Sequence, residues 1–188
     1  MVGGMTVNLP DARPAAGTVY RHTVEAMLTH VVQRHQVMTA QELREKRLDK
    51  PRDLSREDWA ALVKEVARRK SSDGTLATGL EWAGREMMKG YAQGLVGRGV
   101  LMVARLLGPR RALLRLADSY STADDMTKVY GSEKGERHVE LLFNDIDQMP
   151  TYVRGTLSEA LLLLGVQAHD ISFELRADGY TRFDVTWK

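Results

Sequence analysis

The stretch from Leu76 to Leu116 constrains the fold most, because it is one long apolar helical segment interrupted by glycines. The part before Gly97 alone would extend roughly 30 Å, at about 1.5 Å per residue, which is enough to cross a small domain. Glycine costs about 1 kcal/mol relative to alanine inside a helix, so a compensating interaction is expected. The recurring glycines are Gly79, Gly84, Gly90, Gly94, Gly97 and Gly99.

Two explanations of these glycines stay open. In the first, they allow a neighbouring helix or sheet to approach the backbone closely. In the second, the absent side chains leave a groove or cavity for an apolar ligand. The residues predicted to bind this ligand are Met87, Gly90, Tyr91, Gly94 and Leu95.

Three amphipathic helices are predicted before this segment. Apolar residues recur at helical spacing from about Val19 and fade after His35. Thr39 and Glu42 form a capping box that begins the second helix, and Ser55 caps the third with Asp58 three residues later. An Asp-Gly pair then separates the third helix from the central segment.

Domain boundaries follow from the same pattern. Residues 1–16 are rich in Gly, Pro and small residues without periodicity, and we expect them to form a flexible arm. Residues 17–188 are the length of one domain and are predicted to form a single α+β domain.

The last third of the chain predicts strands. Thr127–Tyr130 and Glu136–Phe143 flank Gly131–Gly135, which favours a hairpin with a five-residue loop. Thr151–Leu164 predicts a mostly buried helix that ends at Gly165.

The terminal hairpin has the clearest pattern, because apolar and polar residues alternate in both of its strands. A three-residue loop with Gly179 in a left-handed conformation sets Phe173 opposite Phe183 and Ile171 opposite Val185, which gives one fully apolar face. Together these elements predict an α+β fold. Its helical N-terminal two thirds pack on one face of a small antiparallel sheet, which is formed by two hairpins flanking a helix.

Composition excludes several classes of protein. The chain of 188 residues has no cysteine, so disulfides, thiolate metal sites and cysteine nucleophiles are ruled out, and a reducing cytoplasm is the expected location. A net charge of +2 does not indicate a nucleic-acid or anionic-membrane partner. No apolar run reaches the length of a membrane span.

Catalytic and metal-binding patterns are equally weak. The sequence lacks a Gly-x-Ser-x-Gly elbow around Ser158, a phosphate-binding loop and a His-Glu-x-x-His motif, so we expect neither an enzyme nor a cofactor. Three groups of polar residues have side chains that could ligate a metal, but we expect them to be solvated or locally hydrogen-bonded instead. They are His22 with His30, His138 with Glu140 and His169, and Asp145 with Asp147.

The densest basic cluster is Arg105, Arg110, Arg111 and Arg115. We predict that it is a solvated face or a contact with an acidic protein partner. Nucleic-acid binding is the alternative, but the chain has few aromatic residues and no helix-turn-helix spacing.

Several runs resemble a family of uncharacterised paralogues associated with myxobacteria. They are A-G-R-E-M-M-K-G-Y-A-Q-G-L-V-G-R-G from Ala83, R-L-L-G-P-R-R from Arg105, M-P-T-Y-V-R-G-T-L from Met149 and F-D-V-T-W from Phe183. The likeness covers roughly Val19–Lys188, and this family implies no assigned function.

Gly155–Val185 is also similar, more remotely, to the end of the four-vinyl-reductase type of ligand-sensing domain. That domain shares its fold with transport-particle subunits and haem nitric-oxide-binding domains. The resemblance implies a helix-covered sheet with an internal apolar pocket, often in a dimer, and no chemistry of its own. The cysteines that are common in the vinyl-reductase type are missing, which argues against a metal-related role. Tyr152-Val-Arg154 is not the Tyr-x-Ser-x-Arg clamp of the haem-binding relatives, so we do not expect this chain to bind haem.

The leading hypothesis is a non-enzymatic regulatory or sensory module that binds a small apolar ligand, a protein partner, or both. The first alternative is a structural or interaction protein that forms a homodimer and has no ligand. The second is a nucleic-acid binder that uses the cluster Arg105–Arg115.

Overall fold

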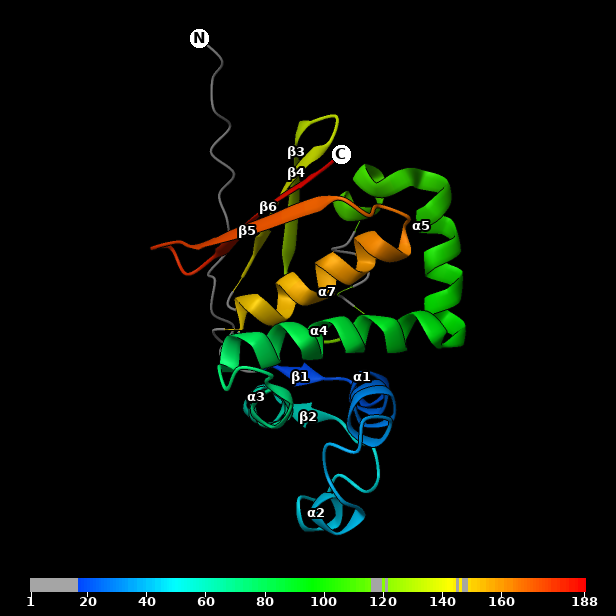
Figure 1. The fold of residues 1–188 in the computed structure, drawn as a ribbon, viewed down its shortest axis with the longest axis vertical. Coiled ribbons are helices and arrows are strands. Elements are labelled where there is room, and N and C mark those ends of the chain that lie inside the picture. The colour runs from blue at the N-terminus through cyan, green and yellow to red at the C-terminus, as the bar shows by residue number, and fades with distance from the viewer. Residues whose placement is uncertain (1–16, 116–119, 121, 145, 147–148) are drawn as a thin grey trace.

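A computed structural model describes residues 17–115, 120, 122–144, 146 and 149–188, except for the side chains of Leu95 and Val96 (Figure 1). The predicted arm, residues 1–16, lies outside the described residues. The elements are β1 (Thr18–Val19), α1 (Arg21–Ala26), the π-helix η1 (Met27–Gln33), α2 (Ala40–Glu45), β2 (Leu54–Ser55), α3 (Arg56–Lys70), α4 (Leu76–Gln93), α5 (Leu95–Leu114), β3 (Val129–Gly135), β4 (His138–Phe143), α7 (Pro150–Leu163), β5 (His169–Leu175) and β6 (Thr181–Trp187).

The elements form layers around α4, which crosses the middle of the molecule (Figure 1). Helices α1, α2 and α3 lie on one side of α4, and α7 lies between α4 and the four-stranded sheet. From the C-terminal end of α4, α5 turns away steeply towards the sheet side. The predicted α+β fold, with helices on one face of a small antiparallel sheet, is confirmed.

The sheet has the strand order β3-β4-β6-β5 and is antiparallel throughout. The predicted register of the terminal hairpin is confirmed, because Phe173 pairs with Phe183 and Ile171 with Val185. Gly179 adopts a φ of 84°, which is the left-handed conformation that this loop requires.

The prediction for the first hairpin was wrong in its loop. Gly131–Gly135 is part of β3, and the chain reverses at Glu136 and Arg137 instead. A register shift between Glu133 and Gly135 marks a bulge just before this turn. The glycines therefore belong to a twisted strand edge, where bulges are common, and not to a long loop.

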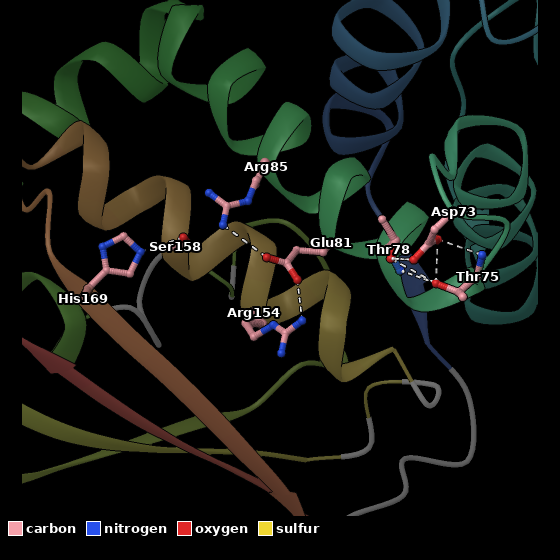
Figure 2. Close-up of polar contacts among 8 residues, drawn as sticks. All are labelled: Asp73, Thr75, Thr78, Glu81, Arg85, Arg154, Ser158 and His169. Carbon is pink, nitrogen blue, oxygen red and sulfur yellow. Dashed lines mark hydrogen bonds and ion pairs between the residues drawn. The ribbon is translucent and has the colours of Figure 1, made fainter.

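The helix starts follow the predicted caps. Thr39 and Glu42 form a complete capping box at α2, and the Ser55 hydroxyl accepts a hydrogen bond from the Asp58 amide at α3. Before α4, the Asp73 carboxylate accepts hydrogen bonds from the Thr75 amide and from the hydroxyl of Thr78 (Figure 2). This network fixes the turn that the Asp-Gly pair predicts and lowers the pKa of Asp73.

The central segment is two helices and not one. Gly94 has an extended backbone and separates α4 from α5. Gly108, with a φ of 78°, then kinks α5 before Pro109, which cannot donate a main-chain hydrogen bond. At the start of α5, a Cβ atom on Gly97 would lie 1.8 Å from the main-chain oxygen of Tyr91, so this glycine permits the sharp turn between the helices.

Close backbone approach explains several glycines of α4. A Cβ atom on Gly84 would lie 2.1 Å from the Tyr152 main-chain oxygen, and one on Gly155 of α7 would lie 2.2 Å from the Glu81 oxygen. One on Gly90 would meet the His30 side chain of η1 at 2.3 Å. Helix α4 therefore contacts both neighbours at distances that only glycine allows.

The described residues form two hydrophobic clusters in the interior. The first gathers apolar residues of η1, α3 and α4, and the second gathers those of the sheet and α7. Phe143 and Phe183, both fully buried, form the centre of the second cluster with ring centroids 5.2 Å apart. Tyr152 packs against both clusters, and a cavity lies where they meet.

Candidate functional site

The candidate site is a cavity of about 250 Å³ at the junction of the two hydrophobic clusters. It is bounded by α1, α3, α4, α5, α7, Tyr120 and residues 122–127, and its lining is mostly apolar. His22 and Val100 line the cavity and are exposed to solvent, so the cavity opens on this side. Residues that contribute to its apolar wall are Trp59, Met87, Met88, Leu101, Ala104, Leu113, Met126, Met149, Val153 and Leu164.

The predicted ligand-binding residues divide into two sets. Met87 and Tyr91, one turn apart on α4, line the cavity. Gly90 lies against His30, and Gly94 ends α4, so neither contributes to the lining. The side chain of Leu95 lies outside what the structure describes. Ligand binding by Met87 and Tyr91 stays a prediction.

Three polar residues of the lining were missed by sequence reasoning. Tyr120 and Asp124 come from the connection before β3, and Tyr152 comes from the first turn of α7. No periodic pattern links these residues, because separate chain segments bring them to one wall. The only local signal is the spacing of Asp124 and Thr127, which is typical of a carboxylate that accepts hydrogen bonds from the following backbone.

Asp124 is held rigidly in this wall. Its side chain accepts hydrogen bonds from the Met126 amide at 2.9 Å and from the amide and hydroxyl of Thr127, the latter at 2.8 Å. Burial nevertheless raises the pKa of Asp124, and the hydrogen bonds from Thr127 and Met126 oppose this shift.

The two tyrosines have strongly perturbed phenols. Burial raises the pKa of Tyr120, and the nearby Asp124 carboxylate raises it further. Burial also raises the pKa of Tyr152, with additional repulsion from Tyr120 and Asp124. The three groups therefore lie close enough to interact electrostatically, and both phenols stay protonated at neutral pH.

The predicted partner-binding arginines are partly engaged within the chain. Arg105 donates a hydrogen bond to the Leu163 main-chain oxygen at 3.0 Å, and Arg110 forms an ion pair with Glu133 at 2.7 Å. Arg111 and Arg115 are exposed. Their role in partner binding stays a prediction.

The histidines do not gather into a metal site. His138 faces Asp184 at 3.2 Å, whereas His169 contacts Ser158 at 2.7 Å. Within the described part of the chain, no three His, Cys, Asp or Glu side chains are placed to hold a metal ion. Asp145 and Asp147 lie outside the described residues.

Buried Ser158 of α7 and half-buried His169 of β5 form a hydrogen-bonded pair (Figure 2). The Val166 main-chain oxygen, 3.3 Å from Nδ1, can only accept, so Nδ1 is the donor in this contact, and in the neutral tautomer Nε2 accepts from the serine hydroxyl. Ser158 is only 3% exposed, and neither side chain lines the cavity. The pair connects α7 to β5 of the sheet.

Comparison with solved structures defines the class of the fold. The chain is similar to a variant of Tt H-NOX, with a TM-score of 0.69 and 9% identity over 90% of this chain and 95% of that chain. It is also similar to an H-NOX protein from S. oneidensis in the Fe(II)NO ligation state, with a TM-score of 0.67 and 12% identity over 90% and 99% of the two chains. The third similar structure is an oxygen-binding H-NOX domain related to soluble guanylate cyclases. Its TM-score is 0.66 and its sequence identity is 12%, over 89% of this chain and 94% of that chain. The chain is thus an α+β domain with the H-NOX fold.

Residues 17–188 match the DUF2378 family, described as a protein family of unknown function, and the chain belongs to that family. No curated protein matches the sequence. The expected likeness to haem nitric-oxide-binding domains is confirmed for the fold, whereas the likenesses to the vinyl-reductase type and to transport-particle subunits, and the myxobacterial association, stay predictions. No helix in the described ranges is long and apolar enough to cross a membrane.

Proposed function

We propose that this chain is a non-enzymatic sensory module that binds a small apolar ligand in the cavity between its two hydrophobic clusters. The cavity carries this proposal, because its volume of about 250 Å³ is larger than an apolar cavity of about 150 Å³ that binds benzene. By simple scaling, a ligand of about ten heavy atoms fits. The H-NOX structures, which include an oxygen complex and an Fe(II)NO state, support a sensory role for this fold.

Haem itself does not fit the residues of the cavity. Haem iron takes an axial histidine, cysteine or tyrosine, or a methionine paired with histidine. The chain has no cysteine, and the one imidazole among the described lining residues is His22, which is exposed and stacks on Tyr20. Burial raises the pKa of the lining tyrosines, which disfavours a phenolate ligand. The two propionates of haem are anionic, yet none of the described lining residues is Lys or Arg, and Asp124 adds a carboxylate. We therefore propose a module that functions without haem or another cofactor.

The outer face of α5 is our candidate surface for a protein partner. Met102, Val103 and Leu106 are 64%, 49% and 84% exposed, which is unusual for large apolar side chains on one helix. The opposite face of the same helix lines the cavity with Leu101 and Ala104. Helix α5 therefore connects the ligand site to an apolar surface. Its charged residues are all arginines, which favours an acidic partner.

Native mass spectrometry tests the ligand proposal on the purified protein. An extra mass that disappears on denaturation is the expected result. Ala104→Trp should remove this mass by filling the cavity, whereas Ala92→Trp, on α4 outside the lining, should retain it. An adduct that survives Ala104→Trp in a folded protein would contradict the proposal. The same spectra give the oligomeric state, and a dimer would make a second copy the first partner to test on α5.

A further inference from the structure

We infer that the cavity selects an uncharged apolar molecule that carries one hydrogen-bonding oxygen, such as an alcohol or a ketone, and that Tyr120 and Tyr152 hold this oxygen. The inference rests on the proposed function and adds the chemical class of the ligand. Its basis is the polar wall of the cavity, where the phenols of Tyr120 and Tyr152 lie near the Asp124 carboxylate within a mostly apolar lining that also contains Tyr91, His22 and several threonines.

Both phenols are available for a ligand. In the described part of the chain, neither the Tyr120 nor the Tyr152 hydroxyl forms a hydrogen bond with the protein. The buried side-chain polar atoms without a hydrogen-bond partner there are Arg154 Nε and Arg182 Nε, so the two phenol oxygens keep accessible surface. Because both residues line the cavity, we assign this surface to the cavity. A buried tyrosine hydroxyl ordinarily has a partner, which a ligand oxygen would supply.

The ring positions are fixed before a ligand enters. Tyr120 packs edge-on against Phe143 with centroids 5.3 Å apart, and Phe143 is fully buried. Tyr152 is anchored on α7 where Gly84 brings α4 against its main-chain oxygen. Two donors on separate elements are thus preorganised, which reduces the entropy lost when a ligand binds.

Charge in the wall disfavours an anionic ligand. A carboxylate placed at the phenols would lie near Asp124, and the described lining contains no Lys or Arg to compensate it. Burying an unpaired charge in an apolar site is costly. An ammonium group is also disfavoured, because the Asp124 oxygens already accept three hydrogen bonds. A ligand with a neutral oxygen neither places an unpaired anion near Asp124 nor needs an additional acceptor from its carboxylate.

Three probes of equal chain length test this inference: 1-octanol, octanoate and octylammonium. Binding is measured at pH 7 by NMR of ¹³C-methyl methionine, because Met87, Met88, Met126 and Met149 line the cavity. Met38, buried outside the lining, serves as the internal reference. We expect 1-octanol to shift the cavity methyl signals with an affinity about tenfold or more above that of either charged probe.

Tyrosine variants then assign the contact. Tyr120→Phe and Tyr152→Phe should each weaken 1-octanol binding about three- to tenfold, the usual loss for one hydrogen bond. Tyr130→Phe, outside the lining, should bind like the natural protein. Equal or tighter binding of a charged probe, or undiminished 1-octanol binding by both cavity variants, would overturn the ligand class and leave the proposed function standing. No shift of the cavity methyl groups by any probe would overturn the proposed function itself.

Discussion

At the scale of single residues, Glu81 is the main polar link between α4 and α7. Its carboxylate accepts from Arg85 on its own helix at 3.1 Å and forms an ion pair with Arg154 of α7 (Figure 2). Burial raises the pKa of Glu81, but the hydrogen bonds and charges of Arg154 and Arg85 outweigh it, so the pKa is lowered overall.

Glu81→Gln should therefore reduce the free energy of unfolding by about 1 kcal/mol at pH 7, because both arginines lose a charged acceptor. The ordinary pKa of a glutamate carboxyl group is 4.5, and that of Glu81 is lower in the folded protein. Its ionised form therefore stabilises the fold at pH values above 4.5, and this contribution is lost as the pH falls through the lowered pKa. Urea unfolding between pH 7 and about pH 3 should show the two proteins converging in acid. The control Glu25→Gln, on the exposed side of α1, should stay near the natural protein. A gap that persists in acid would contradict this account.

At the scale of elements, packing of α4 on α7 depends on glycines that face the partner backbone. Gly84 of α4 lies against the main-chain oxygen of Tyr152, and Gly155 of α7 lies against the main-chain oxygen of Glu81. Each helix therefore contributes a glycine at which the backbone of the other helix packs closely. This arrangement explains why the central segment tolerates residues with poor helix propensity.

Gly84→Ala should destabilise the protein by about 1–3 kcal/mol, because the new methyl group would overlap the main-chain oxygen of Tyr152, which cannot move as a side chain can. The matched control is Gly99→Ala on α5, where a Cβ atom meets no other atom within 4 Å. That variant should be neutral or more stable by up to about 1 kcal/mol, since alanine favours the helix. Chemical denaturation of both variants decides the point, and equal effects would contradict the packing explanation.

Sequence reasoning succeeded where local signals determine the structure. The caps at Thr39 and Ser55 and the left-handed Gly179 each depend on a few neighbouring residues, and all three are present. It failed for Gly131–Gly135, where a glycine-rich run indicated a loop. Pairing with β4 and the adjoining bulge override that local preference, because strand formation depends on a tertiary partner.

The candidate site was predictable only on the helix that carries the glycines. Met87 and Tyr91 were found because a single periodic segment places them on one face. Tyr120, Asp124 and Tyr152 were not, because their proximity depends on how the segment before β3 meets α7. The cavity itself arises from the meeting of two clusters, which no single stretch of sequence encodes.

At the scale of the whole molecule, the two hydrophobic clusters are adjacent along α4 and α7, and the cavity separates part of one from the other. Helix α5 covers the remaining gap, with Leu101 and Ala104 towards the cavity and Leu106 towards solvent. A ligand that occupies the cavity adds packing partners to α5 and to both clusters together. Binding should therefore stabilise the whole fold and not one half of it.

The part of the cavity that water does not fill adds void volume to the folded protein, so hydrostatic pressure should favour unfolding. We expect a volume change towards the large end of about −20 to −100 mL/mol, measured by intrinsic fluorescence under pressure. Ala104→Trp should make this change smaller and raise the pressure of half-unfolding, whereas Ala92→Trp should leave the volume change as it is. Equal volume changes in both variants would contradict this view. The ligand that we propose for this cavity should therefore make the folded protein less compressible.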